Sequence, residues 1–106
     1  MFVIKQNTTF DWPVKARMPE GGKHVTVTFT AQFRVIDHKY VEEHRGDPAA
    51  MLRKALVDFE GDVLDAEGQP VTDPQARCDI ILAQSNFLDA LSNAYAEGLL
   101  GYEAKN

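Results

Sequence analysis

Apolar and polar residues alternate without interruption between Val25 and Val35. Successive side chains of a β-strand point to opposite faces, so this alternation predicts a strand with one apolar face. That face would carry Val25, Val27, Phe29, Ala31, Phe33 and Val35. An earlier run has the same spacing and contains Trp12, Val14, Ala16 and Met18. The segment Pro19–Gly22 between the two runs is typical of a turn, and it therefore predicts an antiparallel hairpin.

A third strand is expected from the apolar residues that precede this hairpin. Phe2 and Ile4 lie two residues apart and would form that strand, with Asn7-Thr8-Thr9 as the bend. A sheet of three strands with one apolar face is stable only when another layer covers that face.

The residues after Val35 carry helical patterns. Asp37 is expected to cap a short helix that runs through Tyr40 and Val41. Asp47-Pro48 predicts the start of a second helix, because an acidic N-cap followed by proline is typical of a first turn. This helix would turn one face toward the core and end near residues 59–61. The core face would contain Met51, Leu52, Ala55 and Leu56.

The segment between the second and third helices has the composition of a tight turn. Asp65–Gly68 would join Val63-Leu64 to Pro70-Val71, which predicts a turn or a minihairpin near residues 62–71. Thr72 and Gln75 then have the spacing of a capping box, while Asp73 would complement the positive end of the helix dipole. The apolar face of this third helix would contain Ala76, Ile80 and Ile81.

A last helix is predicted from Ser85, which would be its cap. Gly98 and Gly101 are expected to loosen or end it. Its apolar stripe would contain Phe87, Leu88, Leu91, Ala94, Tyr95 and Leu99.

Strands come first along the chain and helices follow, which predicts an α+β fold. We expect one domain over residues 1–106, β-rich over 1–35 and helical over 37–101. Its antiparallel hairpin or three-stranded sheet would be covered on one face by three to four helices.

Charge and cysteine content narrow the classes of partner. The chain has 106 residues and a net charge of −5, and its 11 Lys and Arg residues are scattered. Long-range repulsion would oppose binding to nucleic acid or to an anionic membrane, so proteins or small molecules are the better expected partners. A single cysteine, Cys78, excludes an internal disulfide, and no signal peptide or membrane span is recognisable. These features favour a cytoplasmic location.

No catalytic, metal-ligating or cofactor-binding motif is recognisable in the chain. The three histidines, His24, His38 and His44, lack the spacing of a ligand set and are interpreted as surface residues. A calcium loop that started at Asp58 would need glycine and glutamate where Val63 and Gln69 stand, so the acidic turn is interpreted as solvated. Cys78 is predicted to be a packed thiol, not a nucleophile. We therefore expect a protein that is not an enzyme and needs no cofactor.

Three groups of residues, in order, carry a resemblance that covers nearly the whole chain. The first group is Phe10-x-Trp12-x-Val14, then Gly22-Lys23 and Thr28-Phe29-Thr30-Ala31-x-Phe33-Arg34. The second is Leu56-Val57-x-Phe59-x-Gly61, followed by Asp65-x-x-Gly68-x-Pro70-Val71. The third is Ala90-Leu91-x-x-Ala94-Tyr95, then Gly101 and Lys105-Asn106. Together they resemble a family of small phage and prophage tail assembly chaperones, in which tryptophan is usual at the Phe59 position.

The resemblance implies a role in building long phage tails in the host bacterial cytoplasm. Such chaperones coat the aggregation-prone tape measure protein, help to recruit the major tail protein and are absent from the mature virion. They have no active site, so the family implies neither catalytic residues nor a reliable set of contact residues.

The last predicted helix is the expected contact surface, because an amphipathic client helix could lie along its flank. The same stripe of residues is equally typical of a core. The candidate partner-binding residues are Phe87, Leu91, Tyr95, Leu99, Leu100 and Tyr102. Two other functions stay open: a structural tail protein retained in the particle through a free sheet edge, and a small metal-dependent enzyme.

Overall fold

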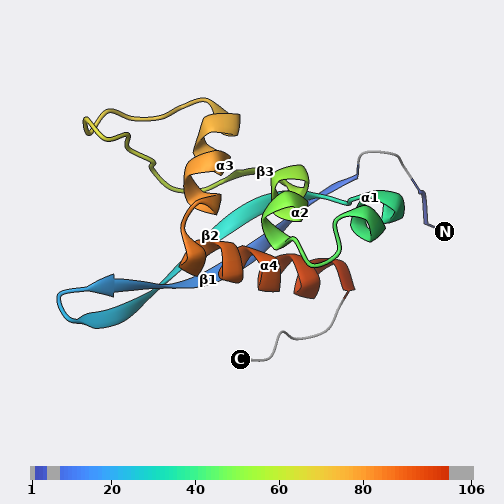
Figure 1. Cartoon of the computed structure of the whole chain (residues 1–106), viewed down its shortest axis with the longest axis horizontal. Coiled ribbons are helices and arrows are strands. Elements are labelled where there is room, and N and C mark those ends of the chain that lie inside the picture. Colours follow the sequence, from blue (N-terminus) through green and yellow to red (C-terminus); the bar gives the residue numbers. More distant parts are fainter. Residues whose placement is uncertain (1, 5–7, 101–106) are drawn as a thin grey trace.

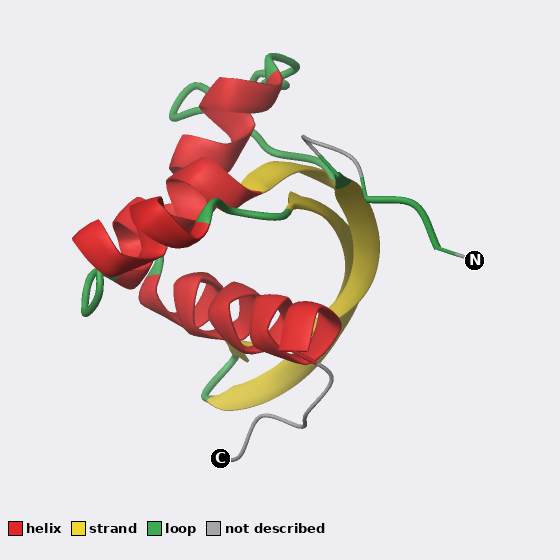
Figure 2. Ribbon diagram, turned by 90° about the vertical axis from the view of Figure 1, so that its right-hand side faces the viewer, coloured by secondary structure: helices red, strands yellow, loops and turns green. Residues whose placement is uncertain are grey.

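The computed structural model describes residues 2–4 and 8–100 and has the predicted α+β fold. The strands are β1 (Thr9–Glu20), β2 (Lys23–Arg34) and β3 (Leu56–Phe59). The helices are α1 (His38–Glu43), α2 (Pro48–Ala55), α3 (Pro74–Leu82) and α4 (Ser85–Leu100). The antiparallel sheet has the order β1-β2-β3, and the helices lie on one face of the curved sheet (Figure 2).

The predicted hairpin is confirmed, and it is longer than the sequence pattern indicates. Its pairing extends from Thr9 opposite Arg34 to Glu20 opposite Lys23. Gly21 and Gly22 form the turn with φ angles of 57° and 82°, a combination that glycine adopts without strain. The turn end of this hairpin projects beyond the helices as an arm (Figure 1).

The third strand is β3, and the prediction that Phe2 and Ile4 form it was wrong. These two residues lie outside any strand and are exposed. The predicted end of the second helix was also wrong, because α2 ends at Ala55 and Leu56–Phe59 pairs with β2. Leucine, valine and phenylalanine fit a half-buried strand, and the free edge of β2 supplies the hydrogen-bonding partners that an isolated segment lacks.

Two Asp-Pro pairs set the starts of α2 and α3. The Asp47 carboxylate accepts a hydrogen bond from the Ala50 backbone N–H at 3.1 Å, as predicted for this cap. The Asp73 carboxylate accepts one from the Ala76 N–H at 3.0 Å. Asp73 is therefore the cap of α3, and the prediction that Thr72 would cap it was wrong by one residue. Aspartate is the stronger acceptor, and the following proline suits the first helical position.

Helix α4 packs along β1 and β2, and Gly98 lies inside it instead of ending it. A Cβ atom at Gly98 would stand 2.7 Å from Phe10 Cε2 and 3.0 Å from Trp12 Cδ2. The glycine therefore permits close contact between helix and sheet. Ser85 is the first helical residue, and the Gln84 carbonyl before it accepts a bond from the Leu88 N–H. Gly101 lies outside the described residues.

The core lies between the sheet and the helices. Its largest fully buried side chains are Phe33, Leu91 and Val14. The Tyr95 ring lies 5.3 Å from the Phe33 ring and 5.9 Å from the Phe10 ring. Helix α4 therefore contributes its predicted apolar stripe to the core, except for Leu99, which is exposed.

The segment between β3 and α3 forms the predicted minihairpin, with a bridge between Leu64 and Pro70. The Asp65 carboxylate accepts hydrogen bonds from the N–H groups of Glu67 and Gln69 and so holds the turn. Within the part of the chain that the structure describes, no helix has both the length and the apolar character that crossing a bilayer requires.

Candidate functional site

The two long edges of the β1–β2 hairpin differ in their capacity to pair with another strand. The Val35 N–H donates to the Thr8 carbonyl on the β1 side, whereas the Glu60 N–H donates to the Thr30 carbonyl from the β3 side. Backbone groups alternate in direction along a strand. The even-numbered residues of β2 therefore direct their N–H and C=O groups away from β1, toward β3.

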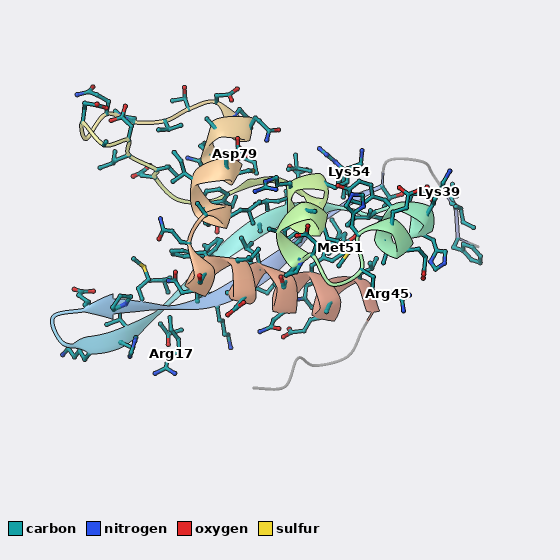
Figure 3. The ribbon with its side chains drawn as sticks, viewed as in Figure 1. Arg17, Lys39, Arg45, Met51, Lys54 and Asp79 are labelled. Carbon is teal, nitrogen blue, oxygen red and sulfur yellow. The ribbon has the colours of Figure 1, made fainter. Side chains whose placement is uncertain are left out.

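The outer edge of β1 is protected against pairing. By the same alternation, its odd-numbered residues direct their backbone groups away from β2. Pro13 and Pro19 stand at two of these positions and have no N–H to donate. Lys15 and Arg17 occupy two others and add charge, and the Arg17 side chain projects away from the helices (Figure 3). Prolines and cations of this kind prevent edge-to-edge association.

The outer edge of β2 lacks this protection. Strand β3 pairs only with the end of β2 near Ala31–Phe33, and the Glu60–Thr30 hydrogen bond is the last contact before the chains diverge. Beyond it, His24, Thr26 and Thr28 have backbone groups directed outward, and none of them is proline. The stretch from His24 to Thr28 is therefore an open strand edge.

Gly61 is the residue at which the chain leaves the sheet. Its φ angle is 117°, a conformation that other residues rarely adopt, and no atom would crowd a Cβ there. The chain then swings away from the hairpin toward the 62–71 turn (Figure 1). A cavity opens between the diverging segments.

We call this cavity the hairpin groove, and its volume is about 460 Å³. Its walls come from the hairpin arm, the segment after β3, α3 and the start of α4. It is lined by Met18, Val27, Thr28, Phe29, Phe59, Glu60, Gly61, Asp62, Val63, Leu64, Ile80, Ile81, Gln84 and Phe87. The lining is mostly apolar, as is usual for a ligand or peptide site.

Aromatic rings form a connected group in the hairpin groove. The Phe29 ring lies 6.0 Å from the Phe59 ring and 6.1 Å from the Phe87 ring, within the range of favourable aromatic pairs. Leu64 stands at the rim and is 57% exposed. The groove therefore combines a fixed aromatic wall with an apolar side chain that a partner could cover.

The charged residues that line the hairpin groove are both acidic. They are Glu60 and Asp62, and the Glu60 carboxylate also accepts a hydrogen bond from the Thr30 N–H at 2.7 Å. An occupant with an apolar face and a positive charge would complement this lining.

Arg77 of α3 holds β3 in the position that shapes the groove. Its Nε donates to the Asp58 carboxylate at 3.0 Å, and another guanidinium N–H donates to the Phe59 carbonyl at 2.6 Å. The guanidinium carbon also lies 4.6 Å from the centre of the Phe59 ring. These contacts join helix and strand although 18 or 19 residues separate the partners in sequence.

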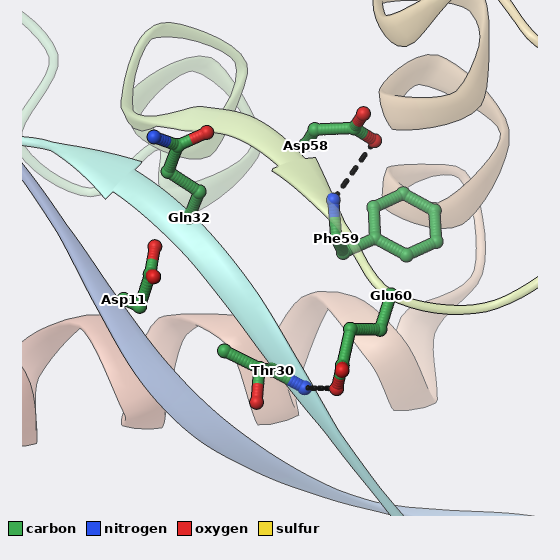
Figure 4. Close-up of a pocket in the computed structure, with 6 residues that line it drawn as sticks. All are labelled: Asp11, Thr30, Gln32, Asp58, Phe59 and Glu60. Atoms are coloured by element: carbon green, nitrogen blue, oxygen red, sulfur yellow. Dashed lines mark hydrogen bonds between the residues drawn. The ribbon is translucent and has the colours of Figure 1, made fainter.

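A second cavity, of about 350 Å³, is lined by residues of the three strands and by Glu60 (Figure 4). Asp11, Gln32 and Asp58 stand on neighbouring strands there. The Asp58 carboxylate is already bound by Arg77 and by the Phe59 N–H. No group of three His, Cys, Asp or Glu residues within residues 2–4 and 8–100 could hold a metal ion.

The structure separates the candidate contact residues of α4 into different environments. Phe87 lines the hairpin groove, but Leu91 is fully buried and Tyr95 packs on the core. A partner could reach Leu91 only if α4 left the sheet, whereas Tyr95 is partly buried. Leu99 is 39% exposed. The Leu100 side chain and Tyr102 lie outside what the structure describes.

The other groups considered from the sequence stand apart from the groove. His38 and His24 are exposed, and His44 stacks on the Tyr40 ring at 3.9 Å. The predicted packing of Cys78 is confirmed, because its thiol is buried against the carbonyls of Leu56 and Val57. Burial, and after it the nearby Asp58 and Asp79 charges, raises the pKa of Cys78 to about 11.

Most of the groove was missed from the sequence because its lining residues come from distant segments. Two features were nevertheless visible. Prolines occur in the first strand but not between Lys23 and Arg34, and Gly61 follows the β-forming residues Leu56–Phe59. No family model, curated protein or solved structure matches the chain.

Proposed function

We propose that this protein is a tail assembly chaperone that binds the tape measure protein and helps to recruit the major tail protein. It acts without catalysis, by reversible contact, in the cytoplasm of the host bacterium. The ordered residue groups that resemble this family support the proposal from the sequence. The hairpin groove, with its apolar lining and acidic rim, is the structural observation that carries it.

The groove suits a holding function for a physical reason. A chaperone of this kind has to cover apolar residues of its client and release them later, so each contact has to be moderate in strength. A single shallow groove with a few aromatic and aliphatic anchors provides such a contact. Glu60 and Asp62 would favour lysine or arginine next to the apolar residues of the client.

The proposal is tested by co-producing the protein with a tape measure protein encoded in the same genome. The fraction of tape measure protein that stays soluble is then measured. Leu64→Glu is the groove variant, because it places a charge at the exposed rim without filling the core. Leu99→Glu is the matched control, since Leu99 is also a partly exposed leucine but does not line the groove.

We expect Leu64→Glu to reduce the soluble tape measure fraction several-fold and Leu99→Glu to leave it near the wild-type value. If Leu99→Glu alone reduces it, the client binds along α4, as the sequence suggested, and the groove assignment is wrong. If the wild-type protein neither binds the tape measure protein nor keeps it soluble, the chaperone function is wrong.

The open edge of β2 favours a second candidate, a structural tail protein that stays in the particle. Subunits of a ring or tube can extend one another's sheets through such edges. Mass spectrometry of purified particles separates the two functions, because a chaperone is absent from finished tails and a structural subunit is present in stoichiometric amounts.

A further inference from the structure

We propose that the segment Phe2–Ile4 of one copy binds the open edge of β2 and the hairpin groove of a second copy as an added strand. This head-to-tail contact concerns the purified chain alone, so it does not depend on the proposed chaperone function. In the purified protein, where no client is present, the groove then has one occupant, namely another molecule of the same protein.

The donor segment is a strand-forming sequence that belongs to none of the strands formed by the described residues of its own copy. Phe2, Val3 and Ile4 are 80%, 74% and 85% exposed, and they are three consecutive large apolar residues. Aromatic and β-branched residues are the ones that strands favour. Apolar residues exposed in this way are typical of an interaction site.

The acceptor has the two parts that strand addition requires. The open edge from His24 to Thr28 supplies backbone donors and acceptors, and the hairpin groove beside it supplies a place for side chains. The other edge of the hairpin is blocked by Pro13 and Pro19, so the two edges are not equivalent.

Strand geometry predicts which donor residues enter the groove. Phe2 and Ile4 would point to one face of the added strand and Val3 to the other. The helix-side face of the arm borders the apolar groove through Val27 and Phe29, whereas the opposite face carries threonines. Phe2 and Ile4 are therefore the anchors. Lys5 follows them in the sequence, and its charge is opposite in sign to the charges of Glu60 and Asp62.

The arrangement in space favours a second copy over the same copy. The Thr8 carbonyl is bound to the Val35 N–H, at the end of the hairpin farthest from its turn. The segment at the start of the chain lies at the same end of the molecule as α1, across the sheet from the helices (Figures 1 and 2), while the arm projects from the opposite end. The molecule is 48 Å long, and β3 occupies the part of the β2 edge nearest to α1. A donor at one end and an acceptor at the other generate a head-to-tail assembly.

The assembly is measured by sedimentation equilibrium of the purified full chain. A three-residue strand makes a small interface, so we expect a dissociation constant on the order of 0.1–1 mM and a molecular mass that rises with concentration. Phe2→Ser with Ile4→Ser should weaken association by at least about tenfold, because two apolar anchors are lost. Val3→Ser, the matched control, should weaken it by less than about threefold, because its side chain would face the threonines.

A second pair of variants tests the acceptor edge. Thr26→Pro removes an outward N–H and places a ring at the open edge, and we expect association to fall by at least about tenfold. Arg17→Pro is the control, because Arg17 lies opposite Thr26 in the hairpin and its N–H is directed to the other edge. Circular dichroism establishes that both variants are folded. If Thr26→Pro does not fold, the inference is decided by comparing the double variant at Phe2 and Ile4 with Val3→Ser. These three residues are exposed, so their substitution should leave the fold intact.

Three results would overturn the inference. One is a wild-type protein that stays monomeric up to about 1 mM, the weakest affinity expected for so small a contact. Another is a double variant at Phe2 and Ile4 that associates no more weakly than Val3→Ser. The third is equal association of folded Thr26→Pro and Arg17→Pro.

Discussion

The Tyr95 hydroxyl joins α4 to the end of β2 and the residues that follow it, and its removal tests whether this bridge stabilises the fold. The hydroxyl accepts a hydrogen bond from the Ile36 N–H at 3.0 Å and donates one to the Arg34 carbonyl at 3.2 Å. Tyr95→Phe removes both bonds but retains the ring, with its contacts to Phe10 and Phe33.

The destabilisation expected for Tyr95→Phe comes mainly from the Ile36 N–H, which would lose its hydrogen-bond partner at a buried residue. A buried donor that loses its partner destabilises a protein by about 1–3 kcal/mol, so we expect Tyr95→Phe to lower the free energy of unfolding by about 2 kcal/mol. In a domain of this size, that loss corresponds to a melting temperature lower by roughly 8–12 °C. Urea unfolding, followed through the fluorescence of Trp12, measures the change at constant m-value.

Tyr40→Phe is the matched control. The Tyr40 hydroxyl donates a longer bond, 3.3 Å, to the Ala50 carbonyl, and that carbonyl lies in the first turn of a helix that has its own cap. We expect its removal to cost less than about 1 kcal/mol. If Tyr95→Phe lowers the free energy of unfolding no more than Tyr40→Phe does, the hydroxyl bridge from α4 does not stabilise the fold, and the role assigned to the Tyr95 hydroxyl is refuted.

Four further predictions concern the packing of Gly98, the support of the groove by Arg77 and the thiol of Cys78. Gly98→Ala should destabilise the protein by about 1–2 kcal/mol, because the cost of the clash with Phe10 exceeds the roughly 1 kcal/mol that alanine gains in helix propensity. A variant with a higher melting temperature than the wild type would contradict this prediction. Arg77→Met should lower the free energy of unfolding, measured in urea, by about 1–2 kcal/mol. The loss is smaller than for a fully buried ion pair because Asp58 is partly exposed. An unchanged urea midpoint would show that the Arg77–Asp58 contact does not stabilise the fold. Alkylation of Cys78 at pH 8 should be about a hundredfold slower in the folded than in the unfolded protein, since the pKa is raised from 9.0 to about 11. The folded state holds the thiol proton more tightly than the unfolded state does. The free energy of unfolding should therefore fall by up to about 2–3 kcal/mol as pH rises from about 9 to 11, when compared with a Cys78→Ala variant.

The elements that the sequence predicted correctly are those encoded by neighbouring residues. Alternation between Val25 and Val35 and the two turn glycines are sufficient for the hairpin, because strand period and turn conformation are local properties. The Asp47-Pro48 start of α2 and the 62–71 minihairpin are likewise encoded within a few residues. The apolar stripe of α4 also predicted a buried face.

The tertiary structure alone decided which segment completes the sheet. Leu56 and Phe59 continue the apolar pattern of α2, so their sequence is compatible with a longer helix. They form β3 because the edge of β2, more than twenty residues earlier in the chain, offers hydrogen bonds and an apolar face to cover. Phe2 and Ile4 have comparable strand propensity but no such edge beside them.

The candidate site depends in the same way on contacts between distant residues. Composition and motifs indicated a protein that binds proteins, but the helix stripe chosen as its surface is largely core. The hairpin groove arises because β3 is short, Gly61 turns the chain away, and Arg77 holds the diverging segment against α3. A periodic pattern shows which side chains share a face, whereas exposure depends on which element covers that face, and only the packed structure decides that.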